Sequence, residues 1–112
     1  WTGITVSAPM AFESSDLSFS VFHSLSLPGL KMTNSKARNV DFEDCDLTKG
    51  EFTNTDFKDA RFNRTKLNMC DFSEAVNYYI DPNSNSMVGA SFSFPEVISL
   101  LAAFDINVKG SF

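Results

Sequence analysis

Two cysteines, one histidine and one Asn-X-Thr triplet are the residues of this 112-residue chain whose types could carry chemistry. Cys45 and Cys70 could bind a metal or form a disulfide, but no histidine or further cysteine is close to either in the sequence, which argues against a zinc site. His23 has no cysteine and no serine–acid arrangement to work with, and we interpret it as an unpartnered surface residue. Asn63-Arg64-Thr65 matches a glycosylation acceptor, which we interpret as coincidental because no secretory context is evident.

Composition and charge exclude several classes of protein. The 14 acidic residues against 9 basic ones give a net charge of −5, which argues against direct nucleic-acid binding. No run of twenty apolar residues is present, so we expect no membrane span. No glycine-rich phosphate loop and no nucleophile beside a base are present, so we predict no enzymatic activity, no cofactor and no metal. The chain begins at Trp1 without an initiator methionine or an apolar leader, so we expect a fragment, a processed chain or an engineered piece, located in the cytoplasm.

Large apolar residues recur at every fifth position over most of the chain. The thirteen positions from Phe12 to Phe72 are all apolar, and only Ala37 among them is small. A second set runs at the same interval from Ser15 to Ala75; its members are uncharged and, apart from two leucines, modest in size. The charged residues between positions 10 and 76 avoid both sets. The pattern therefore separates an inside from an outside with a period of five.

Neither a helix nor a straight strand explains this period. A five-residue step rotates an α-helical side chain by about 140°, and in a strand an odd step alternates the two faces. A coil that turns a corner every five residues keeps both sets inside. Grouping at twenty residues gives matched columns, namely Phe22/Phe42/Phe62, Leu27/Leu47/Leu67 and Phe52/Phe72/Phe92. We therefore predict an all-β solenoid with four walls per coil and roughly four coils, stacked at about 4.8 Å.

The repeated units resemble a known family. The sequence resembles tandem copies of the A(D/N)LXX motif of pentapeptide-repeat proteins over residues 12–76 and again at Ala90-Ser91-Phe92, the matching units being Asp41-Phe42, Cys45-Asp46-Leu47, Thr55-Asp56-Phe57, Ala60-Arg61-Phe62 and Cys70-Asp71-Phe72. The resemblance implies a right-handed quadrilateral β-helix. Departures are Ala37 and the stretch 25–30, where Pro28-Gly29 predicts a distorted corner. Cys45 and Cys70 fall on neighbouring coils but different walls, which predicts free thiols.

The two ends of the chain follow different patterns. We assign residues 1–94 to the β-helix, with an imperfect final coil over 75–94 that contains a loop over 77–86, and residues 95–112 to a helix and tail. Ser93 and Glu96 have the spacing of a capping box, with Pro95 in the first turn, so an α-helix is predicted to follow. Residues 105–109 alternate like a short strand. Residues 1–11 could begin another coil or plug the open end.

The C-terminal segment is more apolar than the end of one coil can cover. It either caps the solenoid alone or also packs against a second copy. Qnr-type pentapeptide-repeat proteins dimerise through a comparable helix and tail, so the resemblance favours a homodimer. The candidate dimer interface comprises Val97, Ile98, Leu100, Leu101, Phe104, Ile106 and Val108.

The outward charges suggest where a partner would bind. The wall through residues 10–14, 30–34, 50–54 and 70–74 has a net charge of −3, and a second acidic patch lies at 41–46. The candidate acidic partner-binding surface comprises Glu13, Glu51, Asp71, Glu74, Asp41, Glu43 and Asp44.

The resemblance also implies an alternative role as a mimic of duplex DNA. Qnr-type members bind type II topoisomerases and protect them from quinolones, which makes gyrase or topoisomerase IV a partner to consider. However, 20 Å of duplex carries about −12, whereas the whole chain carries −5. We therefore predict a non-enzymatic rod that binds an unidentified protein partner, with DNA mimicry as the second reading and a structural module of a larger chain as the third.

Overall fold

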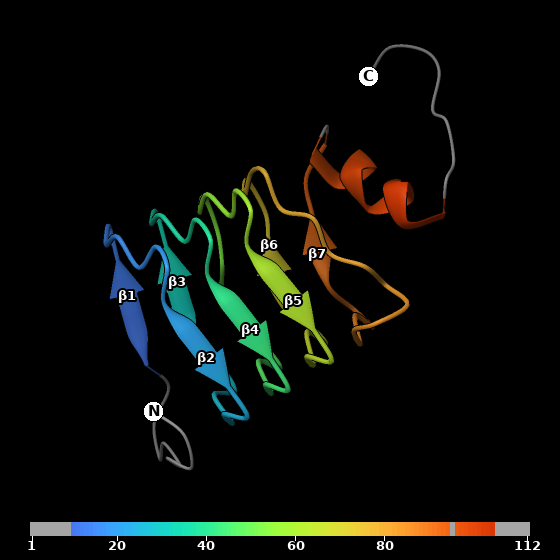
Figure 1. Ribbon diagram of the computed structural model, residues 1–112. Coiled ribbons are helices and arrows are strands. Elements are labelled where there is room, and N and C mark those ends of the chain that lie inside the picture. Colours follow the sequence, from blue (N-terminus) through green and yellow to red (C-terminus); the bar gives the residue numbers. More distant parts are fainter. Residues whose placement is uncertain (1–9, 95, 105–112) are drawn as a thin grey trace.

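The computed structural model describes residues 10–94 and 96–104, with side chains described as far as Leu101. Short parallel strands alternate with turns and wind into a β-helix, and a 3₁₀ helix lies beyond the last strand (Figure 1). The elements are β1 (Ala11–Glu13), β2 (Val21–His23), β3 (Lys31–Thr33), β4 (Asp41–Glu43), β5 (Arg61–Asn63), β6 (Asp71–Phe72), β7 (Ser91–Phe92) and η1 (Glu96–Phe104).

Every backbone ladder joins residues that are twenty positions apart. The sheets have the orders β1-β3, β2-β4-β5 and β6-β7. Isolated parallel bridges, also between residues twenty positions apart, connect the units that have no assigned strand. Within the described residues these pairings form four ladders, which we call wall 1 (residues 11–13, 31–33, 51, 71–72 and 91–92), wall 2 (16, 36, 56 and 76), wall 3 (21–23, 41–43 and 61–63) and wall 4 (26, 46, 66 and 86). The register predicted from the matched columns is confirmed.

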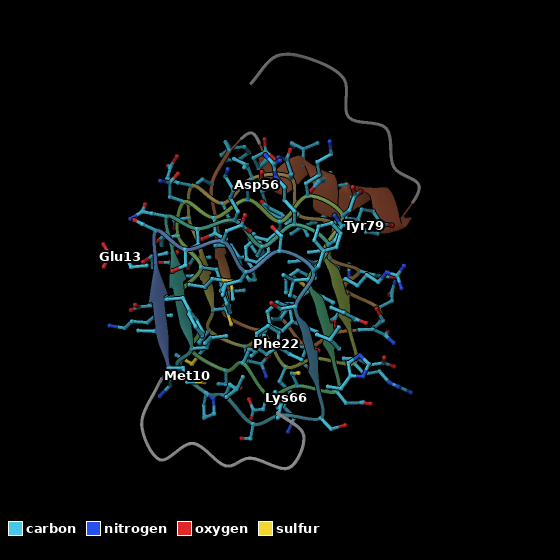
Figure 2. The ribbon with its side chains drawn as sticks, turned by 60° about the vertical axis from the view of Figure 1, so that its left-hand side comes forward. Met10, Glu13, Phe22, Asp56, Lys66 and Tyr79 are labelled. Carbon is cyan, nitrogen blue, oxygen red and sulfur yellow. The ribbon has the colours of Figure 1, made fainter. Side chains whose placement is uncertain are left out.

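The interior consists of columns of side chains that stack from coil to coil along the solenoid axis. Phe42 stacks on Phe22 at a ring-centroid distance of 5.0 Å and on Phe62 at 5.2 Å. Phe72 stacks on Phe52 at 5.1 Å and on Phe92 at 5.2 Å. Figure 2 shows Phe22 directed into the ring of strands and Glu13 directed outward. The predicted columns are therefore real, and burial of these rings is the main source of stability.

Small polar side chains satisfy the backbone at the corners of the coils. The Thr55 hydroxyl donates to the Met32 carbonyl oxygen at 2.6 Å, and the Thr65 hydroxyl donates to the Phe42 carbonyl oxygen at 3.1 Å. The Cys45 thiol donates in the same way to the Phe22 carbonyl oxygen at 3.0 Å. Each acceptor lies 23 residues earlier, on the preceding coil. This explains why the second inward set is rich in Ser, Thr and Cys, since an apolar side chain would leave these buried carbonyl groups with fewer donors.

The corners share a left-handed residue at the fifth position of the A(D/N)LXX unit, two residues after the large inward side chain. Thirteen non-glycine residues in the described part of the chain have positive φ, and most of them occupy this position, together with Gly29 and Gly89. At Leu27–Leu30 the Leu30 amide donates to the Leu27 carbonyl oxygen at 3.1 Å, and Gly29 has φ 76°. A proline second and a glycine third suit a type II turn. The predicted distortion at Pro28-Gly29 is therefore wrong, because this corner has the hydrogen bond and φ sign of its neighbours.

The segment 77–86 combines the predicted loop with two buried side chains. No strand of wall 3 is assigned in it among the described residues, and Ser86 and Ser91 then resume the ladder opposite Lys66 and Asp71. Tyr78 and Ile80 are nevertheless fully buried. The Tyr78 ring lies 5.4 Å from that of Phe92. Two core residues therefore lie in a stretch whose polar composition predicts only a loop.

The C-terminal helix η1 is a 3₁₀ helix and not the predicted α-helix. The capping box does not form, because both side chains accept hydrogen bonds from the preceding coil. Ser93 Oγ accepts from the Glu74 amide at 3.2 Å, and a Glu96 carboxylate oxygen accepts from the Asn77 amide at 3.1 Å. The predicted strand over 105–109 lies outside the described residues. Within residues 10–94 and 96–104, no helix has the length and apolar content needed to cross a membrane.

Candidate functional site

The predicted acidic surface lies on two opposite walls. Glu13, Glu51, Asp71 and Glu74 belong to wall 1 and the corner that follows it, whereas Asp41, Glu43 and Asp44 belong to wall 3 and its corner. Figure 1 shows the sheet of β2, β4 and β5 facing the strands β1, β3, β6 and β7 across the core. The seven carboxylates therefore form two separate groups.

The acidic group on wall 1 is only partly neutralised. Glu51 lies 3.6 Å from the Lys31 ammonium group of the preceding coil. Asp71 accepts a hydrogen bond at 2.9 Å from the Ser73 amide, which fixes the turn after β6. Glu13 and Glu74 have no ion-pair partner among the described residues and are exposed. Exposed charges of this kind contribute little to stability and are available to a partner.

The acidic group on wall 3 is in contact with one arginine and one histidine. One Arg64 guanidinium nitrogen lies 2.6 Å from a Glu43 carboxylate oxygen and 3.2 Å from an Asp44 oxygen. His23 contacts Asp41 and Glu43 from the preceding coil. This group is therefore a mixed-charge cluster and does not present a run of free negative charge.

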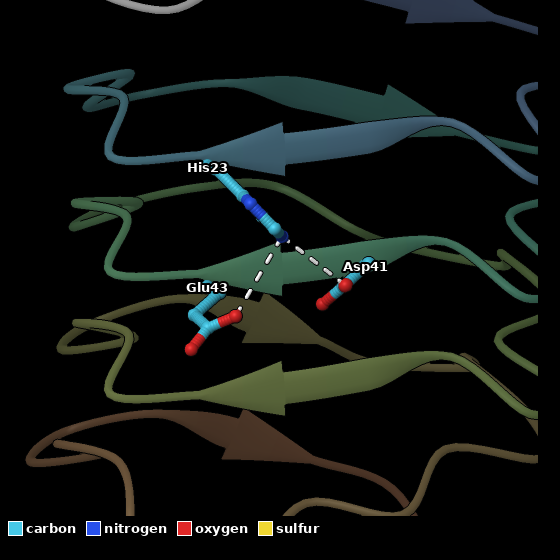
Figure 3. Close-up of side chains that lie close together, drawn as sticks. All are labelled: His23, Asp41 and Glu43. Atoms are coloured by element: carbon cyan, nitrogen blue, oxygen red, sulfur yellow. Dashed lines mark hydrogen bonds and ion pairs between the residues drawn. The ribbon is translucent and has the colours of Figure 1, made fainter.

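His23 has partners, and the interpretation of it as unpartnered is wrong. Its Nε2 atom lies 3.2 Å from Asp41 Oδ2 and 3.6 Å from Glu43 Oε2 (Figure 3). His23 is the register partner of Glu43, and Asp41 lies two residues earlier on the same outward face. The signal was present in the sequence, because the twenty-residue register places His23 beside Glu43.

A surface groove of about 710 Å³ runs past the corner between walls 2 and 3. Its apolar lining includes Phe19, Val21 and Tyr79, which are 74%, 56% and 53% exposed. The rest of its lining consists of Asn39, Asp41, Asp59, Ala60 and Arg61. The groove was not predicted from the sequence, because Phe19 and Tyr79 come from different coils and are brought together only by the fold.

Phe19 adopts a backbone conformation that disfavours bulky side chains. Its φ is 66°, and the equivalent corner position in the next coil is Asn39, with φ 57°. Asparagine tolerates this region, whereas a large β-carbon substituent costs about 1–2 kcal/mol. An aromatic ring that is strained and exposed contributes little to folding, which makes this groove the strongest candidate for a contact surface.

The two buried thiols and the buried phenol remain protonated at neutral pH and are therefore unreactive. Cys45 and Cys70 are free and buried, as predicted. Burial raises the pKa of Cys45 above its usual value and that of Cys70 to about 12, so both stay protonated at neutral pH. Burial, with a smaller contribution from Glu96, raises the pKa of Tyr78 to about 12. The Tyr78 hydroxyl has no hydrogen-bond partner among the described residues.

The candidate dimer residues are only partly within the described region. Val97, Ile98, Leu100 and Leu101 are half-buried on η1, and Leu100 packs against the core. Phe104 belongs to η1, but its side chain is outside the described set, as are Ile106 and Val108 entirely. Ser99 Oγ donates to the Tyr78 carbonyl oxygen at 3.1 Å, which ties η1 to the last coil.

Comparisons with known proteins give one family and several structures. Residues 27–64 match a family described as pentapeptide repeats, in eight copies. No curated protein sequence matched the chain significantly. Among solved structures, this chain is similar to full-length QnrB1, a plasmid-mediated fluoroquinolone resistance protein, with 14% identity and a TM-score of 0.40. The alignment covers 85% of this chain and 68% of the QnrB1 chain. Rfr23, a pentapeptide repeat protein of the cyanobacterium Cyanothece 51142, has 12% identity and a TM-score of 0.33, covering 83% and 67%.

Proposed function

Because residues 27–64 of this chain are pentapeptide repeats, we propose that the protein is a non-enzymatic β-helical rod that binds a protein partner through its outer walls. In this proposal residues 1–94 form a right-handed quadrilateral β-helix of about four coils, and residues 95–112 cap its end. A rigid solenoid suits this role, since each coil adds a fixed strip of surface without moving the others.

The observation that carries the proposal is the exposed aromatic groove on an otherwise filled rod. Its interior is occupied by stacked rings and small hydrogen-bonded side chains, and both thiols are buried there. The side chains that are able to contact a partner therefore lie on the outer surface. Phe19, Val21 and Tyr79 share one groove with both carboxylate and guanidinium groups around them. Clustered exposed apolar side chains with a polar rim are typical of protein-binding sites.

The test is to remove the two aromatic rings without altering the corners. In the double variant Phe19→Asn/Tyr79→Asn, the left-handed Phe19 corner takes the residue already present at the equivalent Asn39, and Tyr79 takes the same polar side chain. We expect the purified double variant to lose a specific protein that the wild-type chain retains from a lysate of its source cells, measured by quantitative mass spectrometry. Loss of two central aromatic contacts costs a typical interface several kcal/mol.

The matched control for this experiment is Met69→Asn. Met69 is 59% exposed and occupies a corner with φ 59°, like Phe19, but it does not line the groove. The control should retain the same protein as the wild type. Equal retention by the double variant, or equal loss in the control, would contradict a role for the groove.

DNA mimicry is the alternative hypothesis, and the arrangement of charges does not favour it. Arg64 neutralises Glu43 and Asp44, Lys31 approaches Glu51, and Arg38 lies 2.7 Å from Asp56. Duplex DNA presents about one unpaired negative charge per 1.7 Å of its axis. An assay of gyrase supercoiling with and without a quinolone distinguishes the two readings, since only a DNA mimic would inhibit or protect the enzyme.

We further propose that η1 and the tail join two copies of the chain. Half-buried apolar side chains on η1, including Leu101, support this assembly. We expect sedimentation velocity to give about twice the 12.4 kDa of one chain for the wild type, and Leu101→Asp to give a monomer, because a carboxylate buried in an apolar contact is strongly unfavourable. Met69→Asn should remain dimeric. A wild-type chain that sediments as a monomer at all concentrations excludes the dimer.

A further inference from the structure

We propose that His23, Asp41 and Glu43 form a site for a divalent transition metal such as Zn²⁺ on the outer face of β2 and β4. His23 and Glu43 are direct register partners on these two strands, and Asp41 lies two residues before Glu43 on the same face. Figure 3 shows the imidazole between the two carboxylates. Two hydrogen-bonded strands hold all three side chains, so the set is positioned by backbone structure and not by a loop.

The separations between the three ligand atoms fit a small metal ion. Nε2 of His23 lies 3.2 Å from Asp41 Oδ2 and 3.6 Å from Glu43 Oε2, and the three atoms lie within 4.8 Å of one another. Zinc bonds to imidazole nitrogen and carboxylate oxygen are about 2.0–2.2 Å long, so neighbouring ligands of a tetrahedral ion are about 3.3–3.6 Å apart. Two of the separations are therefore close to those of a loaded site, and an ion requires only a small side-chain adjustment.

The surroundings of the cluster leave one open coordination position and fix one carboxylate. His23 is exposed, so water can reach the ion as a fourth ligand. Arg64 binds Glu43 through the other carboxylate oxygen, Oε1, at 2.6 Å, which leaves Oε2 directed at His23. Hydrogen bonds of this kind orient ligating carboxylates. The positive charges of Arg64 and of Arg61, which pairs in register with Asp41, oppose the ion. We therefore expect micromolar and not tighter affinity.

Competing sites in the described part of the chain are few, which makes the test clean. Both cysteines are buried inside the solenoid and stay protonated at neutral pH, so they are poor zinc ligands until the chain unfolds. His23 is the single histidine of the sequence. Any imidazole signal that responds to a metal therefore belongs to His23, provided that the protein carries no histidine tag.

The experiment is a titration of the tag-free full chain with ZnCl₂, followed by calorimetry and by the ¹⁵N signals of the imidazole. We expect one equivalent to bind and to shift the Nε2 signal. Each of the variants His23→Ala, Asp41→Asn and Glu43→Gln should weaken binding at least about tenfold. All three positions are on the outer face, so the variants should retain the circular dichroism spectrum of the wild type.

The matched control is Glu51→Gln, which removes a carboxylate beside Lys31 on wall 1. It should bind zinc like the wild type. The proposal is overturned if no heat of binding is observed, if the imidazole signal does not move, or if His23→Ala and Glu51→Gln bind equally well. The three side chains would then form a surface hydrogen-bond cluster alone. The outcome is independent of the proposed protein partner, because the assay contains only the chain and the metal.

Discussion

Replacing Phe42 by alanine is expected to lower the free energy of unfolding by about 3–5 kcal/mol. Phe42 is fully buried and is stacked between Phe22 and Phe62, at 5.0 and 5.2 Å. The substitution therefore removes two ring contacts at once and leaves a gap in the middle of a column, where the coils above and below are held apart by their backbone ladders. Since a domain of this size has about 5–15 kcal/mol of stability in total, the variant would lose a large share of it, and its unfolding midpoint would shift strongly to lower urea concentration and temperature.

Urea and thermal denaturation followed by circular dichroism measure this effect. The matched control is Phe12→Ala, because Phe12 has the same role in the unit but lies on β1 in the first described coil and is only half-buried. Its loss of stability should be clearly smaller. Equal losses for the two variants would show that stability does not depend on the position of a ring within its column.

Gly50→Ala is expected to destabilise the fold by about 1–3 kcal/mol, although alanine is the smallest possible addition. A β-carbon at Gly50 would lie 2.6 Å from Cε2 of Phe52 and 2.9 Å from the Leu47 carbonyl oxygen. That carbonyl accepts the Gly50 amide at 2.8 Å in the same turn, so it cannot retreat without breaking the corner. The ring of Phe52 is fully buried and has no free space to occupy.

A double-mutant cycle identifies the cause. In the variant Gly50→Ala/Phe52→Leu the smaller side chain gives way to the new methyl group, so the combined loss should be less than the sum of the two single losses. Denaturation of the four proteins under the same conditions provides the numbers. Additive losses would place the cost of Gly50→Ala elsewhere than in its contact with Phe52.

The regular part of the fold is predictable because the sequence separates its inside from its outside. Large apolar residues every five positions can be buried only by a chain that turns at each unit, and the matched phenylalanines then select the twenty-residue register. The stacking of Phe22, Phe42 and Phe62 confirms both steps. The free, buried state of Cys45 and Cys70 follows from the same register and is also confirmed.

The irregular part depends on contacts that composition does not encode. Asn85 resembles a loop residue, yet its amide group donates to the Phe62 carbonyl oxygen at 3.0 Å and so takes the role that Thr65 has one coil earlier. Ser93 and Glu96 have the spacing of a capping box, but the neighbouring coil offers amides that compete for them. In both places a hydrogen-bond partner about twenty residues away, on the neighbouring coil, determines the local structure.

The candidate site was harder to predict because its members are ordinary surface residues. The sequence predicts Glu43 and Asp44 as part of an acidic surface, whereas Arg64, twenty positions after Asp44, neutralises both. Phe19 and Tyr79 were not predicted as site residues, although they line the same groove. The register that orders the core also orders the exterior, and applying it to outward positions predicts the contacts of His23 with Glu43 and of Arg64 with Asp44.

The constant step of twenty between ladder partners has a consequence for how such a chain can change in length. Loss of one complete turn would leave every later residue on its own side of the rod and would bring Phe62 directly onto Phe22. Loss of a single five-residue unit would rotate everything downstream by one side and would mismatch the surface pairs that span the deletion, such as His23 with Glu43 for a unit lost between them. In-frame duplication or deletion of whole turns is therefore the route by which molecules of this design can lengthen or shorten while their interiors stay intact.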